Sequence, residues 1–152
     1  MSERVLVTGC CGYLGAWITV SLLRAGFAVR GSSREPDYAR KLFDEVFGAD
    51  AAGEALRARL EVVPGELLDA ASWRGAAEGC DAVVHTACPV ATDAGTPARA
   101  MLEPAVQGTE NVQREAARAG VLRRFVYVSS VVALLDHHRP SPERDARVGP
   151  AD

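Results

Sequence analysis

The sequence predicts a doubly wound α/β fold, in which helices cover both faces of a parallel sheet of about five strands. Short apolar runs alternate with longer amphipathic stretches along the 152 residues, which is typical of repeated strand–helix–strand units. The apolar runs are continuous, so we expect both faces of each strand to be buried. The length suits one domain, which we place at residues 1–135.

Each strand candidate is rich in Val, Leu or Phe and is bounded by polar or glycine-containing segments. The candidates are residues 5–8, 27–32, 60–63, 82–85 and 124–129. Right-handed crossovers between them give the sheet order 3-2-1-4-5.

The helix candidates lie between these runs. Residues 12–25 place Leu14, Trp17, Ile18 and Leu22 on one stripe at helical spacing, and Gly26 ends this helix. A second helical region at 36–59 is expected to break near glycines 48 and 53, and a short third helix covers 69–79.

The last helix candidate covers residues 97–119 and is ended by Gly120. Its helical spacing directs Leu102, Val106, Val112 and Ala116 inward. The polar, proline-containing tail at 136–152 is expected to be loop or disordered.

Composition excludes several classes of function. A net charge of −3 argues against a nucleic-acid partner, which requires a clustered positive surface. No apolar run approaches the roughly 20 residues of a membrane span, and no signal peptide precedes the first strand, so we expect a cytoplasmic protein without a membrane partner. The four cysteines lack Cys-x-x-Cys spacing and predict no metal site.

Three glycines at intervals of three, in Val5-Leu-Val-Thr-Gly-Cys-Cys-Gly-Tyr-Leu-Gly15, join the first strand to the first helix. Gly9 permits a tight turn, Gly12 lets the backbone approach a pyrophosphate, and Gly15 lets helix and strand pack closely. The helix N-terminus offers N–H groups to phosphates. The sequence therefore predicts a nucleotide-binding loop of the Rossmann type, in which Cys10 and Cys11 are small packing residues.

The end of the second strand indicates which dinucleotide is bound. NAD enzymes usually carry an acidic residue there, and this chain has Val29-Arg-Gly-Ser-Ser-Arg34 instead. Arg30 and Arg34 are predicted to bind the extra phosphate of NADP, with Ser32 or Ser33 adding a hydroxyl group. NAD is the alternative cofactor.

Five segments in order resemble the extended short-chain dehydrogenase/reductase superfamily, also called the NAD-dependent epimerase/dehydratase family, and within it the dihydroflavonol reductase and cinnamoyl-CoA reductase-like branch. They are Thr8-Gly-Cys-Cys-Gly-Tyr-Leu-Gly15, Val29-Arg-Gly-Ser-Ser-Arg34, Gly79-Cys-Asp-Ala-Val-Val-His-Thr-Ala-Cys-Pro89, Glu103-Pro-Ala-Val-Gln-Gly-Thr-Glu-Asn111 and Phe125-Val-Tyr-Val-Ser-Ser130.

The resemblance implies a role for each matching position. Glu66 stands where the family has an aspartate that meets the adenine amino group, and Ser130 matches the serine that orients the substrate carbonyl. His85, Thr109 and Asn111 are expected to be structural. The cofactor-binding residues predicted from the loop and the resemblance are Thr8, Gly9, Gly12, Tyr13, Leu14, Gly15, Arg30, Arg34, Glu66, Leu67, Thr86, Ala87 and Ser129.

The family's Tyr-x-x-x-Lys pair does not occur in these 152 residues. The residues four positions after Tyr13, Tyr38 and Tyr127 are Trp, Leu and Val, and the one lysine, Lys41, lies in the second helical region. We expect the motif to lie beyond the segment, and the chain by itself to lack turnover. Val126 and Val128, or their neighbours, should then form an apolar surface facing water.

The leading hypothesis is the NADP-binding portion of an oxidoreductase acting on a CH–OH or carbonyl group of a small, unidentified substrate. A nucleotide-sugar epimerase or dehydratase fragment and a non-catalytic dinucleotide-sensing module are the alternatives. A homodimer is possible for the full-length protein.

Overall fold

A computed structural model of the chain describes residues 2–90, 95–120 and 124–131, and the predicted tail at 136–152 lies outside these ranges. None of the helices within them is long and apolar enough to cross a membrane. The elements are β1 (Arg4–Thr8), α1 (Tyr13–Arg24), β2 (Ala28–Ser33), α2 (Pro36–Phe47), α3 (Ala51–Arg57), β3 (Leu60–Pro64), the 3₁₀ helix η1 (Ala70–Trp73), β4 (Ala82–His85), α4 (Ala98–Ala119) and β5 (Arg124–Tyr127).

The strands form one parallel sheet in the order β3-β2-β1-β4-β5, which confirms the predicted topology. β1 lies at the centre, with Leu6 opposite Arg30 of β2 and Val83 of β4. The chain winds outward from β1 in both directions, so β1 and β4 meet where the winding reverses. In sheets of this kind ligands bind at that point, beyond the carboxyl ends of the strands.

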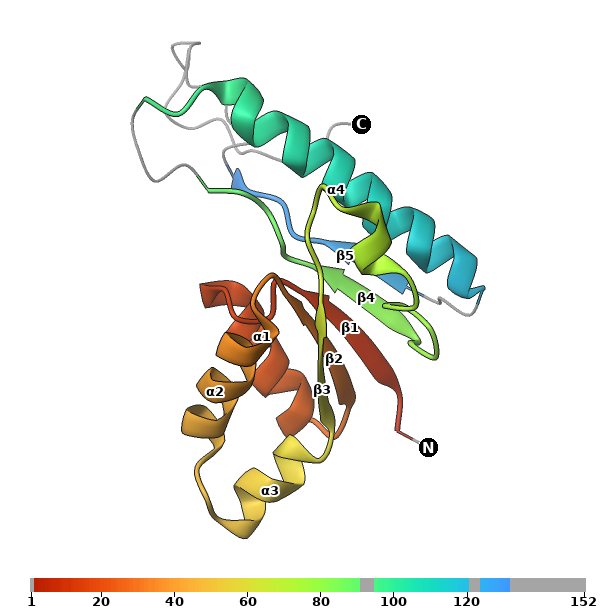
Figure 1. The fold of residues 1–152 in the computed structure, drawn as a ribbon. Coiled ribbons are helices and arrows are strands. Elements are labelled where there is room, and N and C mark those ends of the chain that lie inside the picture. Colours follow the sequence, from red (N-terminus) through yellow and green to blue (C-terminus); the bar gives the residue numbers. More distant parts are fainter. Residues whose placement is uncertain (1, 91–94, 121–123, 132–152) are drawn as a thin grey trace, which may run out of the picture.

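Helices lie on both sides of the sheet (Figure 1). α1, α2 and α3 lie on one side, while α4 and η1 lie together on the other. The two layers bury separate apolar clusters. The first joins Val5, Val7 and Val29 to α1 and α2, and the second joins Leu6 and Val83 to Trp73, Val112 and Ala116.

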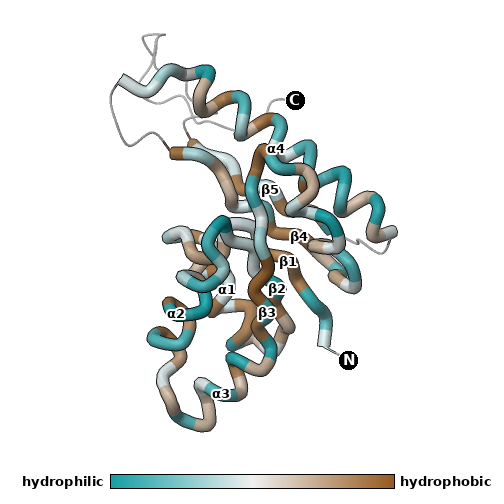
Figure 2. The backbone as a smooth tube through the Cα atoms, in the orientation of Figure 1, coloured by the Kyte–Doolittle hydropathy of each residue, from teal (hydrophilic) through white to brown (hydrophobic). Residues whose placement is uncertain are grey.

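The apolar residues follow this layering (Figure 2). Hydrophobic residues are prominent in the central strands, with hydrophilic ones among them, and the helices carry both hydrophobic and hydrophilic residues. Burial of both strand faces agrees with the continuous apolar runs in the sequence. The sheet also carries buried polar residues near its carboxyl edge, namely Thr8, Ser32 and His85.

The buried face of α1 only partly matches the predicted stripe, of which Ile18 and Leu22 pack against the core. Gly15, Thr19, Val20 and Leu23 are buried, whereas Trp17 is 60% exposed. The small residues Gly15 and Thr19 let the helix approach the sheet closely, and Leu14 and Trp17 therefore turn outward.

The inward face of α4 was predicted correctly only for its C-terminal half. Val112 and Ala116 are buried, but Leu102 and Val106 are exposed. The helix meets η1 and β4 through the half that begins at Gly108, which explains the difference.

The break in the second helical region falls at Gly48, as predicted, but Gly53 is not a break. It lies inside α3, where its N–H donates to the Asp50 side chain at 2.7 Å. A Cβ atom on Gly53 would lie 2.3 Å from the Phe47 carbonyl oxygen, so this glycine permits a close approach of the chain.

Candidate functional site

The carboxyl edge of the sheet gathers nearly all the predicted site residues. The glycine loop follows β1, Arg34 follows β2, Glu66 and Leu67 follow β3, Thr86 and Ala87 follow β4, and Ser129 and Ser130 follow β5. Parallel strands end at one edge, so segments far apart in the sequence converge there. Arg30 is the exception, since it lies inside β2.

The glycine loop requires glycine at its first and third positions. Gly9 has a φ of 65°, in the left-handed region, and a Cβ atom on it would lie 3.1 Å from Ala87 Cα. A Cβ atom on Gly15 would lie 2.1 Å from the Gly9 carbonyl oxygen. The loop is therefore a tight turn in which the backbone at residue 9 touches both α1 and the segment after β4.

The start of α1 is open to an anion. Gly12 is its N-cap residue, no side chain caps this end, and the first turn holds no acidic residue. The first N–H groups of a helix have no partner within the helix and carry its positive dipole end. Tyr13, the first residue of the helix, is 86% exposed.

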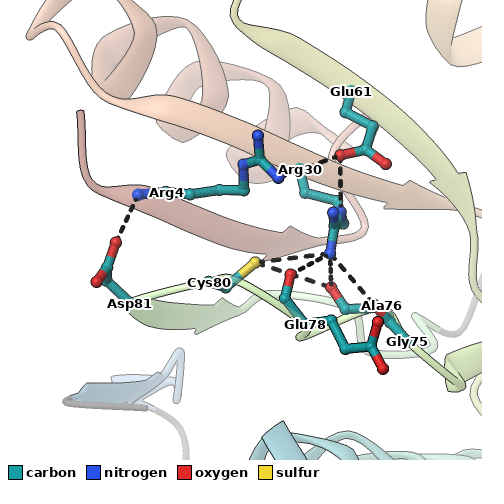
Figure 3. A network of polar contacts seen from close by, with 8 residues as sticks. All are labelled: Arg4, Arg30, Glu61, Gly75, Ala76, Glu78, Cys80 and Asp81. Atoms are coloured by element: carbon teal, nitrogen blue, oxygen red, sulfur yellow. Dashed lines mark hydrogen bonds and ion pairs between the residues drawn. The ribbon is translucent and has the colours of Figure 1, made fainter. Parts of the chain in front are cut away.

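Arg30 lies inside β2, and its guanidinium is bound by protein acceptors instead of lying free at the end of the strand, where the sequence placed a phosphate-binding group (Figure 3). Its Nε donates to Glu61 Oε2 at 2.9 Å, and its Nη1 donates to the carbonyl oxygens of Gly75, Ala76 and Glu78 at 3.2, 3.1 and 2.7 Å. The side chain points from mid-strand toward the turn after η1. Its charge is thus engaged in holding that turn to β2 and β3 (Figure 3).

Arg34 remains as the exposed guanidinium beyond β2. The turn that carries it is held by Ser33, whose Oγ accepts the Glu35 N–H at 3.0 Å and lies 3.2 Å from Cys11 Sγ. Ser33 is buried, so it links the glycine loop to the turn at Arg34 rather than facing outward. Cys10 packs against Gly31, and burial raises the pKa of its thiol to about 12.

The segment after β3 is fixed by α4 and η1. Asn111 Nδ2 donates to the Leu67 carbonyl oxygen at 2.8 Å, and a Cβ atom on Gly108 would lie 2.5 Å from the Leu67 side chain. Trp73 Nε1 donates to the Glu66 carbonyl oxygen at 2.7 Å. Glu66 itself is exposed.

Thr8 holds the segment after β4 in place. Its Oγ lies 3.1 Å from the backbone nitrogens of both Thr86 and Ala87, and the Thr86 hydroxyl donates to the Thr8 carbonyl oxygen. The His85 ring is buried between Thr8 and Thr109, and burial lowers the pKa of His85 to about 4. The imidazole is therefore neutral at physiological pH. The sequence indicates structural roles for His85 and Thr109, but it carries no signal of their connection to Thr8.

Ser129 and Ser130 follow β5 and are both exposed. Val126, one strand position before Tyr127, is 42% exposed, as expected, whereas Val128 is half-buried. A surface hollow of about 130 Å³ lies elsewhere, between η1 and α4, and is lined by Arg74, Arg114 and Arg118 among others. We place the site at the carboxyl edge because the glycine turn and the open helix end lie there.

Comparisons with known proteins identify the family of the chain. The sequence profile of the NAD dependent epimerase/dehydratase family matches residues 5–151. Cinnamoyl-CoA reductase 1 of Petunia hybrida is 41% identical over 141 residues, which cover 93% of this chain and 39% of that protein. Dihydroflavonol 4-reductase of Hordeum vulgare is 32% identical over 143 residues, which cover 93% of this chain and 38% of that protein.

Solved structures share the fold. Vestitone reductase from alfalfa superposes with a TM-score of 0.59 at 26% identity, over 83% of this chain and 36% of the reductase. Yeast methylglyoxal/isovaleraldehyde reductase Gre2, solved with NADPH, superposes with a TM-score of 0.75 at 24% identity, over 90% of this chain and 40% of Gre2. The chain thus spans about two fifths of the length of these relatives. It belongs to the NAD dependent epimerase/dehydratase family, where its relatives include cinnamoyl-CoA and dihydroflavonol reductases.

Proposed function

We propose that this chain is the dinucleotide-binding portion of an NADP-dependent oxidoreductase that acts on a carbonyl or CH–OH group of a small molecule. The observation that carries the proposal is the glycine turn. A Cβ atom on its third glycine would lie 2.1 Å from the Gly9 oxygen, and this close approach brings the uncapped start of α1 to the carboxyl edge. When bound, the nicotinamide cofactor accepts or supplies hydride.

The residues at this edge fit a dinucleotide. The N–H groups of Tyr13, Leu14 and Gly15 are available for the diphosphate, since no side chain caps α1. Glu66 and Leu67 would border the adenine on one side of the loop, and Thr86, Ala87 and Ser129 the ribose and nicotinamide on the other.

The preference for NADP rests on Arg34. With Arg30 engaged by Glu61 and three carbonyl groups, Arg34 is the guanidinium at the end of β2 that a ribose 2′-phosphate would meet. The two residues before it, Ser32 and Ser33, are uncharged and buried, so no carboxylate there opposes the phosphate. The next residue, Glu35, is the N-cap residue of α2 and carries a negative charge beside Arg34. The affinity for NADPH therefore reflects the combined effect of both charges.

Binding of NADPH and NADH, followed by the fluorescence of the reduced nicotinamide, tests the proposal. We expect tighter binding of NADPH, and a loss of roughly tenfold or more in NADPH affinity for Arg34→Ala with little change for NADH. Arg24→Ala is the matched control, because Arg24 lies in the last turn of α1, away from the carboxyl edge. An Arg34→Ala variant that binds NADPH as tightly as the parent contradicts the NADP assignment. Tighter binding of NADH than of NADPH by the parent protein favours the epimerase alternative.

The reaction class is supported by the relatives and by Ser130. The curated relatives named above are reductases, and Ser130 stands after β5 at the same edge as the glycine loop. A serine hydroxyl at that point can orient a carbonyl group through a hydrogen bond. The proton-transferring Tyr-x-x-x-Lys pair of the family does not occur in the 152 residues, so the proposed role of this segment is to bind and orient.

A further inference from the structure

A continuous row of hydrogen-bonding groups runs from α4 to the glycine loop through the interior. Thr109 Oγ of α4 lies 2.7 Å from the Ala105 carbonyl oxygen and 3.1 Å from His85 Nε2. His85 Nδ1 lies 2.7 Å from Thr8 Oγ, which in turn lies 3.1 Å from two backbone nitrogens, those of Thr86 and Ala87. Thr8 and His85 are almost completely buried, so water does not compete for these bonds.

The hydrogens and lone pairs of these groups permit only one order of donors and acceptors along the row. The Thr109 hydroxyl has a single hydrogen, which it donates to Ala105, so toward His85 it can only accept. His85 therefore carries its proton on Nε2, and its bare Nδ1 accepts the hydroxyl hydrogen of Thr8. The two lone pairs of Thr8 Oγ are then both free to accept, one from Thr86 N–H and one from Ala87 N–H.

The opposite tautomer does not satisfy these groups. A proton on Nδ1 would be a third N–H donor aimed at Thr8 Oγ, which has only two lone pairs. The Thr8 hydroxyl hydrogen would also lose its acceptor. A buried donor left without a partner is unfavourable, because it has given up its hydrogen bond to water without a replacement.

The turn held by Thr8 touches the glycine loop at two points. A Cβ atom on Gly9 would lie 3.1 Å from Ala87 Cα, and one on Gly15 would lie 3.0 Å from Thr86 Oγ. A shift of residues 86 and 87 would therefore change the space around the first and third glycines. α4 also holds the other flank of the site, since Asn111 donates to the Leu67 carbonyl oxygen.

We propose that Thr109 fixes the Nε2–H tautomer of His85 and thereby holds the 86–87 turn in the position that a bound dinucleotide requires. His85 and Thr109 are positioning residues in this arrangement and do not touch the cofactor. The effect on dinucleotide binding rests on the proposed function, whereas the assignment of donors and acceptors from Thr109 to Thr8 rests on the geometry alone.

The ring-nitrogen chemical shifts of His85 in the parent protein, labelled with nitrogen-15, give the first test and need no variant. We expect Nε2 protonated and Nδ1 bare at neutral pH. A ring protonated on Nδ1 overturns the proposal, whether or not a cofactor binds.

The second test compares Thr109→Val with Thr109→Ser. Valine has a similar shape but cannot accept the His85 N–H, whereas serine keeps the hydroxyl group. For valine we expect a mixed tautomer signal, several-fold faster hydrogen exchange at the amides of residues 86 and 87, and NADPH affinity weakened roughly fivefold. For serine we expect values within about twofold of the parent.

The outcomes distinguish a failure of the positioning role of Thr109 from a failure of the proposed function. If the valine variant exchanges and binds NADPH like the parent, the positioning role is refuted. If the parent binds neither NADPH nor NADH, the proposed function fails and the cofactor part of this inference fails with it, whereas the tautomer and exchange results still decide the hydrogen-bond order.

Discussion

Arg30 Nε and Glu61 Oε2 lie 2.9 Å apart on the neighbouring strands β2 and β3, and the same guanidinium binds three carbonyl oxygens of the turn after η1. A charge this buried is tolerated because it is paired and because its N–H groups find acceptors. Figure 3 shows that the contacts tie β2 and β3 to the segment that leads into β4.

We therefore expect Arg30→Met to lower the free energy of unfolding by about 3 kcal/mol, since it leaves buried carbonyl groups without donors. Urea unfolding gives the measurement. Arg40→Met is the control, because Arg40 is exposed and its ion pair with Asp37 lies on the surface, where the loss should be below about 1 kcal/mol. An Arg30→Met variant with the stability of the parent but weaker NADPH binding would contradict this structural role and support the cofactor-binding role predicted from the sequence.

Gly15→Ala should abolish dinucleotide binding and lower stability. The added methyl group would lie 2.1 Å from the Gly9 carbonyl oxygen, which is backbone and can move only if the loop moves. Overpacking of this kind costs about 1–3 kcal/mol. Gly95→Ala is the matched control, because a Cβ atom there meets nothing within 4 Å. Retained NADPH affinity in Gly15→Ala would show that the close approach is not needed for binding.

The topology, and the convergence of most candidate site residues at one edge of the sheet, were predictable from the sequence, since both depend on local signals. Apolar runs mark the strands, the three glycines mark the loop, and the parallel arrangement brings Arg34, Glu66 and Ser130 to one edge. These signals need only the order of residues along the chain.

The role of Arg30 could not be predicted in the same way. β2 is buried along nearly its whole length, so its sequence gives no alternation to show which side chains face the turn after η1. Three acceptors of Arg30 are backbone carbonyls 45 to 48 positions away, and the identity of a residue does not show that its carbonyl accepts a hydrogen bond. The fourth is the Glu61 carboxylate on the neighbouring strand. The outward turn of Trp17 has a related cause, because a pair of small residues, Gly15 and Thr19, decided how α1 packs.

The 152-residue chain should show no carbonyl reduction with NADPH. Ser130 can orient a carbonyl, but no tyrosine in the chain is followed four positions later by lysine. Steady-state assays with small carbonyl substrates, at NADPH concentrations that saturate the protein, give the measurement, and NADPH binding by the same sample serves as its control. Turnover that disappears in Ser130→Ala would contradict this expectation and assign catalysis to the segment itself.

Stability should fall in acid because His85 is buried as the neutral imidazole. Burial lowers its pKa from 6.5 to about 4, so between these values the unfolded chain binds a proton that the folded chain does not. The stabilising contribution is therefore complete above pH 6.5 and is lost as the pH falls toward 4, by at most about 3 kcal/mol. Protonation would also place an N–H on Nδ1 against Thr8 Oγ, which already accepts two backbone N–H groups, and would break the row that holds residues 86 and 87.

Urea unfolding of the parent and of His85→Gln at a series of pH values between 4 and 7 measures this contribution. The variant is expected to be less stable at pH 7, and the rise of its stability with pH should be shallower, since the side chain that gains a proton on unfolding is gone. Parallel pH profiles for the two proteins would mean that His85 keeps its ordinary pKa in the folded state, and that the buried row from Thr109 to Thr8 is open to protons.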